Sequence, residues 1–262
     1  MTREELGMVR KLSALLLLPL LAGCLSAGYP RESHCTLKPS VSPPAGVVFV
    51  ANGSGDFHTV TDNLAEVVSQ ACVPVEIQTF TWSHGYGRYV YDHVHHANQV
   101  ERGRCLTAQI MAYHQAFPER RIFLMGHSAG CAVVLAAAES LPPDSIDRVI
   151  LLAPSVSQEY DLRMALRAAR YGIDSFNSGH DYWILGLGMR IFGTADGRGR
   201  AAAGHSGFVP IVACPADAAL YSKLRQHPWD PVVQWSGHSG GHYGSNQVGF
   251  LRAYVLPLLV CG

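Results

Sequence analysis

The sequence has 262 residues, of which 48% are hydrophobic, enough to bury one large core but not two. Twenty lysine and arginine residues balance twenty aspartate and glutamate residues. A balanced chain creates no long-range field that would attract nucleic acid or an anionic surface. We therefore expect a single domain, a monomer, and no nucleic-acid partner.

The first 23 residues are typical of a secretory signal peptide. The basic pair Arg10-Lys11 precedes the apolar run 12–21, which at about ten residues is too short to span a bilayer. The next residues, Leu21-Ala22-Gly23-Cys24, resemble a bacterial lipobox. This resemblance implies cleavage before Cys24, lipidation of its thiol, and a lipid-anchored protein of the bacterial cell envelope that faces the periplasm or the exterior. The alternative is an ordinary signal peptide with an incidental cysteine.

Residues 24–45 are predicted to be a tether or an N-terminal arm, because four prolines interrupt any regular element there. The domain is expected to occupy residues 46–262. An exported chain can oxidise cysteines, but the sequence does not determine which would pair. The six cysteines after Cys24 are Cys35, Cys72, Cys105, Cys131, Cys214 and Cys261.

Within the domain, apolar runs alternate with segments of helical periodicity. The pattern predicts strands at 46–51, 75–81, 122–125, 148–153, 173–177 and 232–235, and helices at about 59–72, 97–117, 160–171 and 246–259; residues 208–214 are a further apolar run. Alternation of this kind favours an α/β fold with a mostly parallel, doubly wound sheet. In such a sheet, functional residues gather in loops at the carboxyl ends of the strands.

A G-x-S-x-G pentapeptide, Gly126-His127-Ser128-Ala129-Gly130, lies between a predicted strand and a predicted helix. Small residues allow a strand to turn directly into a helix, and such a turn exposes the serine hydroxyl. At these residues the chain resembles the α/β-hydrolase superfamily of lipase- and esterase-like serine hydrolases. The resemblance implies a nucleophilic Ser128 and cofactor-free hydrolysis of a small-molecule or lipid ester or thioester.

A serine hydroxyl needs a base to accept its proton, and histidine suits this role near neutral pH. The resemblance implies the order nucleophile, acid, histidine, so the base should follow the last strand. Two histidines lie there in Gly237-His238-Ser239-Gly240-Gly241-His242. We favour His242, which directly precedes the final predicted helix, and keep His238 as the alternative.

The base in turn needs a carboxylate that fixes its tautomer. Asp181 follows the strand 173–177, and its Ser178-x-x-Asp181 setting looks like the one in which many α/β-hydrolases present their acid. Asp217 also follows an apolar run and is closer to His242 in sequence. We favour Asp181; Asp217 and then Asp230 remain alternatives.

The oxyanion formed during attack needs preorganised N–H donors. By the resemblance, one donor is the N–H of Ala129, which follows the nucleophile. The other comes from the loop after the first strand, where Gly53-Ser54-Gly55 allows a close approach of the backbone. We nominate the Ser54 N–H, with Gly53 as its neighbour.

Two further features lead to weaker expectations. The run His93-x-His95-His96 has no acidic or cysteine partner that completes a recognisable metal set, so we expect no metal and no other cofactor. Residues 184–207 combine apolar side chains with many glycines, and we expect a lid or insertion over an acyl pocket. An acyltransferase that uses the same triad and a non-catalytic, membrane-anchored binding protein are the alternatives to a hydrolase.

Overall fold

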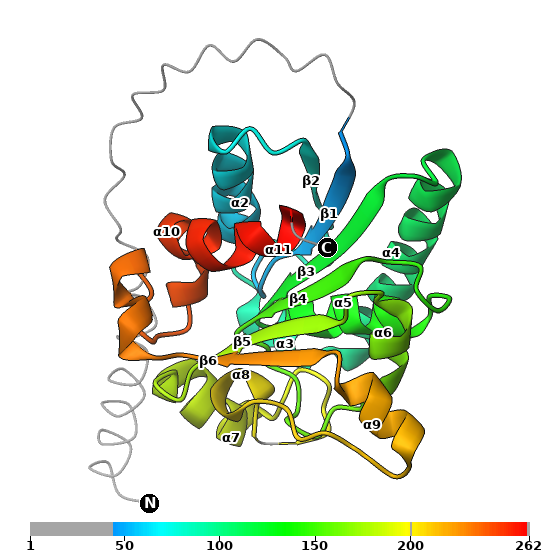
Figure 1. Cartoon of the computed structure of the whole chain (residues 1–262). Helices are drawn as coiled ribbons and strands as arrows, with labels where there is room; N and C mark the ends of the chain where they lie inside the picture. Colours follow the sequence, from blue (N-terminus) through cyan, green and yellow to red (C-terminus); the bar gives the residue numbers. More distant parts are fainter. Residues whose placement is uncertain (1–43, 200, 261–262) are drawn as a thin grey trace, which may run out of the picture. The chain divides into compact units, whose positions relative to one another are not determined.

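The computed structural model describes residues 44–199 and 201–260, all within one compact unit, Val41–Gly262. Within these residues, six strands form one sheet in the order β2-β1-β3-β4-β5-β6, and every neighbouring pair is parallel (Figure 1). The predicted parallel α/β sheet is therefore confirmed. The predicted signal peptide, Cys24 and almost all of the predicted tether lie outside the described residues.

The first five strands lie close to the predicted positions, and three of them, within 46–51, 121–127 and 148–152, contain the continuous apolar runs that suit strands buried on both faces. The bounds of all six strands are β1 (Gly46–Ala51), β2 (Val75–Thr79), β3 (Arg121–His127), β4 (Arg148–Leu152), β5 (Ile173–Asn177) and β6 (Leu224–Pro228). In β1, Val47 and Phe49 point into one core cluster, whereas Val48 and Val50 point into the other. Both faces of the sheet therefore carry helices.

Figure 1 shows the two helical layers. One face carries α2 (Thr59–Gln70) and the C-terminal helical run α10 (Val248–Phe250), η5 (Leu251–Val255) and α11 (Leu256–Val260). The other carries α4 (His96–Ala116), α5 (Gly130–Glu139) and α6 (Arg163–Ala168). Shorter helices occupy the connections: α3 (Tyr89–Val94), η2 (Tyr182–Gly188), α7 (Met189–Phe192), α8 (Ala203–Ser206), α9 (Pro215–Tyr221), η3 (Pro231–Ser236) and η4 (Gly244–Asn246).

One predicted strand is wrong. Residues 232–235 belong to the 3-10 helix η3, which begins because the Asp230 carboxylate accepts the Val232 N–H and Pro231 occupies the first helical position. The apolar run 208–214 has no regular structure, and the sixth strand is instead β6. Its sequence, LRQHP, is polar because an edge strand is only partly buried.

The strand order places the loops that carry the predicted site residues next to each other. The chain passes from β1 outward to β2 and then returns to β3 on the opposite side of β1, with Ala51 in register with Gly126. The loops after β1 and β3 therefore emerge side by side at the carboxyl edge, the usual position of a binding crevice in such sheets. No helix in the described part of the chain combines the length and apolarity needed to cross a membrane.

Candidate active site

Ser128 lies at the turn between β3 and α5 in a left-handed conformation with φ of +52°. Side chains rarely adopt this backbone conformation, so the surrounding structure must hold it. A Cβ atom on Gly126 would lie 2.7 Å from the Cα of Cys131, and one on Gly130 would overlap the carbonyl oxygens of Ala51 and Asn52. Both glycines are therefore required by close packing around the turn.

A chain of hydrogen bonds links Ser128 to a histidine and a carboxylate. His242 Nε2 lies 2.9 Å from Ser128 Oγ, and His242 Nδ1 lies 2.6 Å from Asp181 Oδ2. A carboxylate can only accept, so Nδ1 carries the proton and Nε2 is left to accept the serine hydroxyl hydrogen. The structure thus brings together the favoured nucleophile, base and acid.

Asp181 is held by the start of η2 as well as by His242. Its Oδ1 atom accepts the backbone N–H of Leu185 at 3.2 Å, and its side chain is buried. Burial alone would raise the pKa of this carboxyl, but the hydrogen bond from His242 and the charge of that ring lower it below its ordinary value. Asp181 is therefore ionised and suited to stabilise an imidazolium.

The loop that carries His242 is fastened to the loop that carries Asp181. The Ser178 hydroxyl, just after β5, donates a 2.6 Å hydrogen bond to the Gly240 carbonyl. Gly240 has φ of +93°, a conformation that glycine adopts without strain. Acid and base are thus fixed relative to each other by a direct contact between their loops.

The alternative base, His238, has a different environment. Its Nδ1 atom accepts the Gly240 N–H at 3.1 Å, and its ring packs edge-on against Phe250 with centroids 4.9 Å apart. Burial lowers the pKa of His238 to about 4, so its ring is neutral at neutral pH. These contacts give His238 a place in the packing of the loop, whereas Ser128 Oγ hydrogen-bonds with His242.

The alternative acids are also engaged elsewhere. Asp217, on α9, accepts the Ala213 N–H at 2.9 Å and pairs with Arg163 at 3.3 Å. Asp230 caps η3 through the Val232 N–H. Neither contact involves His242.

Of the nominated oxyanion donors, Ala129 directly follows Ser128, and Ser54 lies in a loop that passes beside it. A Cβ atom on Gly53 would lie 3.5 Å from Ser128 Cβ, so the loop after β1 passes directly against the nucleophile. Among the described residues, neither the Ala129 N–H nor the Ser54 N–H donates a hydrogen bond. Both N–H groups are thus without an acceptor among the described residues, as an oxyanion hole would require.

Two side chains next to Ser128, those of His127 and Cys131, are buried and uncharged at neutral pH. The ring centroid of His127 lies 5.1 Å from that of His242. Burial, together with this nearby ring, lowers the pKa of His127 to about 3. Burial raises the pKa of the Cys131 thiol. His127 is therefore a neutral packing partner, and Cys131 is the buried filler that its position behind the turn predicts.

The histidine run takes part in loop contacts. His93 Nε2 donates to the Gly193 carbonyl, His96 Nδ1 donates to the Ala195 carbonyl, and His95 hydrogen-bonds with His84. Among the described residues, no group of three or more histidine, cysteine, aspartate or glutamate side chains is arranged to hold a metal ion. The four cysteines that the structure describes, Cys72, Cys105, Cys131 and Cys214, are free thiols, and Cys35 and Cys261 lie outside the described residues.

One buried carboxylate beside the site was not predicted. Asp92, on α3, is fully buried and binds the loop after β1. The surrounding sequence, Tyr89-Val90-Tyr91-Asp92-His93, mixes aromatic and polar residues without helical periodicity, so it gives no signal that Asp92 points inward.

A family model described as "Serine aminopeptidase, S33" matches residues 42–176, just over half of the chain. The matched segment contains β1 to β4, nearly all of β5, and Ser128. Asp181 and His242 lie beyond its end. The match therefore covers the half of the domain that builds the nucleophile turn.

Known proteins with similar sequences include two described as monoglyceride lipases. The chain is 27% identical over 139 residues to a monoglyceride lipase homolog of monkeypox virus, covering 52% of this chain and 48% of that protein. It is 30% identical over 121 residues to the monoglyceride lipase of Rattus norvegicus, covering 45% and 38% respectively. The chain thus spans less than half the length of either relative.

Similar solved structures include a poly(3-hydroxybutyrate) depolymerase from Bordetella parapertussis, with a TM-score of 0.49 and 17% identity over 84% of this chain and 81% of that one. The catalytic core domain of acetyl xylan esterase from Trichoderma reesei gives a TM-score of 0.42 and 16% identity, over 81% and 99% respectively.

Proposed function

This chain belongs to the α/β-hydrolase family whose model is described as "Serine aminopeptidase, S33", and we propose that it hydrolyses carboxylic esters or thioesters through an acyl-Ser128 intermediate. The observation that supports this proposal most directly is the continuous hydrogen-bonded chain from Ser128 Oγ through His242 to Asp181. The three side chains come from three different loops at one edge of the sheet. Packing alone would not require that arrangement.

In the first half of the reaction, Ser128 Oγ attacks the carbonyl carbon of the ester while its proton moves to His242 Nε2. The Asp181 carboxylate stabilises the imidazolium that results. The negative charge forms on the former carbonyl oxygen, which the Ala129 and Ser54 N–H groups receive. Collapse breaks the bond to the leaving alcohol, which takes the proton from His242, and the acyl group stays on Ser128.

In the second half, a water molecule replaces the alcohol. It gives a proton to His242 Nε2 as its oxygen attacks the acyl carbon, and the same two N–H groups receive the charge. Ser128 then leaves with the proton from His242, and a carboxylic acid is released. An alcohol could replace water at this step, which is the acyltransferase alternative.

We propose an uncharged substrate with an apolar acyl chain. Exposed aromatic side chains directly follow the acid and the base: Tyr182 and Trp183 after Asp181, and Tyr243 after His242. Apolar side chains at the mouth of a site favour apolar substrates because both lose contact with water on binding. The monoglyceride lipase relatives support the same substrate class.

The test is active-site labelling with a fluorophosphonate probe, combined with hydrolysis of p-nitrophenyl butyrate. The wild-type protein should be labelled and should turn over the ester, whereas Ser128→Ala and His242→Ala should do neither. His238→Asn, which replaces a buried histidine of the same loop but keeps an acceptor for the Gly240 N–H, is the matched control and should still be labelled. A folded wild type that neither reacts nor hydrolyses would point to the non-catalytic binding protein, and ester products formed with an added alcohol would point to the acyltransferase.

We further propose that the chain is exported and anchored to a bacterial membrane through lipidated Cys24. The support is the Leu21-Ala22-Gly23-Cys24 sequence behind a basic pair and an apolar run. Cys24→Ser should abolish incorporation of labelled palmitate and release the protein from the membrane fraction. Continued lipid labelling of that variant would exclude Cys24 as the acceptor.

A further inference from the structure

We propose that Asp92 is a positioning residue for the oxyanion hole, because its buried carboxylate holds the loop that presents the Ser54 N–H. The inference rests on the proposed function, since an oxyanion hole matters only where an oxyanion forms. Asp92 does not contact the reacting atoms in this proposal. It acts through the backbone of residues 53–55.

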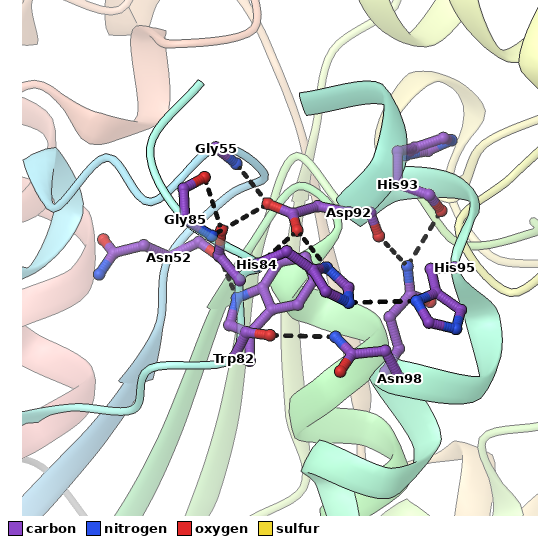
Figure 2. Close-up of polar contacts among 11 residues, drawn as sticks. Asn52, Gly55, Trp82, His84, Gly85, Asp92, His93, His95 and Asn98 are labelled. Atoms are coloured by element: carbon purple, nitrogen blue, oxygen red, sulfur yellow. Dashed lines mark hydrogen bonds and ion pairs between the residues drawn. The ribbon is translucent and has the colours of Figure 1, made fainter. Parts of the chain in front are cut away.

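Asp92 accepts four hydrogen bonds, two on each carboxylate oxygen (Figure 2). Oδ2 accepts the Gly55 N–H at 2.8 Å and the Ser83 hydroxyl at 2.6 Å. Oδ1 accepts both the backbone N–H and the ring Nδ1–H of His84 at 2.8 Å. The carboxylate therefore joins the loop after β1 to the loop after β2.

The contact with Gly55 lies one residue from the proposed donor. Gly55 has φ of +87°, and its carbonyl accepts the Gly87 N–H at 3.1 Å. On the other side of Ser54, Gly53 packs against Ser128, and the Asn52 carbonyl accepts the indole N–H of Trp82 at 2.8 Å. Ser54 is thus held from both sides, which is the preorganisation that an oxyanion donor requires.

A carboxylate is chemically suited to this position. It offers about four acceptor sites and no donor, which matches four converging N–H and O–H groups. Burial would raise the pKa of Asp92, but the hydrogen bonds from His84, Ser83 and Gly55 lower it below its ordinary value. An asparagine at position 92 could not replace the carboxylate, because its amide nitrogen is a donor. That nitrogen would have to face either the Gly55 and Ser83 donors or the two His84 donors, and it could accept from neither pair.

A second layer holds His84 in turn. Since His84 Nδ1 donates to Asp92, its Nε2 accepts a hydrogen bond from His95 Nδ1 at 3.1 Å, and the two rings stack with centroids 5.0 Å apart. The side chains of His84 and His95 come from different segments of the same crossover between β2 and β3. One histidine of the run His93-x-His95-His96, namely His95, therefore braces the carboxylate network.

The test compares Asp92→Asn with Asp174→Asn, both measured below the melting temperature of the less stable variant. Asp174 is the matched control: it is also fully buried and fully paired, with Arg148, Arg225 and His227, but it lies near the amino end of β5. We expect Asp92→Asn to lower kcat by roughly 10- to 100-fold, while KM changes by less than about twofold. Asp174→Asn should lower the melting temperature without changing kcat.

A trifluoromethyl ketone inhibitor distinguishes positioning from general damage, because its hemiketal places an oxyanion in the hole. Asp92→Asn should weaken this inhibitor by the same factor as kcat, and Asp174→Asn should not. Unchanged kcat and inhibition in a folded Asp92→Asn protein would overturn the inference, as would equal losses in both variants. If Asp92→Asn does not fold, Ser83→Ala, which removes one donor to Asp92, takes its place in the comparison under the same criteria. A wild type without esterase activity would instead overturn the proposed function, and the positioning role with it.

Discussion

At the scale of single residues, surroundings rather than residue type distinguish the proposed catalytic groups from their neighbours. His127, His238 and His242 are all buried, but only His242 hydrogen-bonds with both Ser128 and a carboxylate. The same contrast separates Asp181, which binds His242, from Asp217, which binds an arginine. Contacts of this kind decide which titratable group can take part in catalysis.

Replacement of Asp181 by asparagine should reduce kcat by about three to four orders of magnitude, because an amide can no longer select the correct tautomer of His242. KM should change little. Asp217→Asn makes the same chemical change at a carboxylate that binds Arg163 and should leave kcat within about twofold of wild type. Steady-state hydrolysis of p-nitrophenyl butyrate gives kcat and KM for each variant. A large loss of kcat in Asp217→Asn alone would assign the role of the acid to Asp217 instead.

The sequence predicted much of this local arrangement, but not all of it. The glycine pattern around Ser128 reflects steric needs that sequence patterns express directly. The superfamily order placed the acid after the strand 173–177 and the base after residues 232–235, although these last residues form the helix η3 and not the predicted strand. The choice between His242 and His238 needed coordinates, because both lie in the same glycine-rich stretch within four positions. Asp92 was not predicted because its partners, Gly55 and His84, belong to two other loops. Contacts between loops produce no periodic pattern in the sequence.

At the scale of elements, prediction worked best where a segment is buried on both faces. Strand β1 has the predicted bounds because its burial requires apolar residues along its length. Strand β5 also has the predicted bounds, although its buried residues include Asp174 and Ser175. The edge strand β6 and the short helices α3 and α9 were not predicted. Their structure depends on a neighbouring strand, a cap or a loop contact, so tertiary context determined what local composition did not.

The segment from η2 to α7 presents apolar residues in two directions. Leu185 and Met189 pack into a small cluster with Ala153 and Ala202, whereas Trp183 and Ile191 are 78% and 62% exposed. Because Leu185 also supplies an N–H to Asp181, deletion of the segment would disturb the acid. Substitution of its exposed residues is therefore the sharper test of the predicted lid.

The double variant Trp183→Ser, Ile191→Ser should lower kcat/KM for p-nitrophenyl octanoate about tenfold relative to the acetate ester, which corresponds to the lost burial of roughly two methylene groups. The control is Val232→Ser, Trp235→Ser on η3, which removes two equally exposed apolar side chains outside the segment. The control should keep the wild-type preference. An unchanged preference in the first variant would remove the segment from the acyl site.

At the scale of the whole molecule, two buried neutral histidines make folding sensitive to acid. Burial lowers the pKa of His127 to about 3 and that of His238 to about 4, from an ordinary value of 6.5. Between pH 6.5 and 4 the unfolded chain binds protons that the folded chain does not. The free energy of unfolding therefore falls as the pH falls through this window, by up to about 1.4 kcal/mol per pH unit for each histidine.

His238→Asn should reduce the slope of the free energy of unfolding against pH between pH 6.5 and 4. The reason is that the variant takes up about one proton fewer on unfolding. Asparagine offers an oxygen near the place of the ring Nδ1, so the acceptor for the Gly240 N–H is retained. Denaturant titrations at several pH values give the slope. An identical slope in wild type and variant would show that His238 is not a source of the acid sensitivity.

The two halves of the domain contribute different parts of the site. Ser128 and both proposed oxyanion donors lie in the first half, whereas Asp181 and His242 lie in the second, with His242 close to the final helical run. During synthesis from the N-terminus, the elongating chain therefore carries Ser128 without its proposed base until His242 has been added. A translation product that stops before His242 contains Ser128 and both proposed oxyanion donors but lacks the proposed base, so we expect it not to hydrolyse esters.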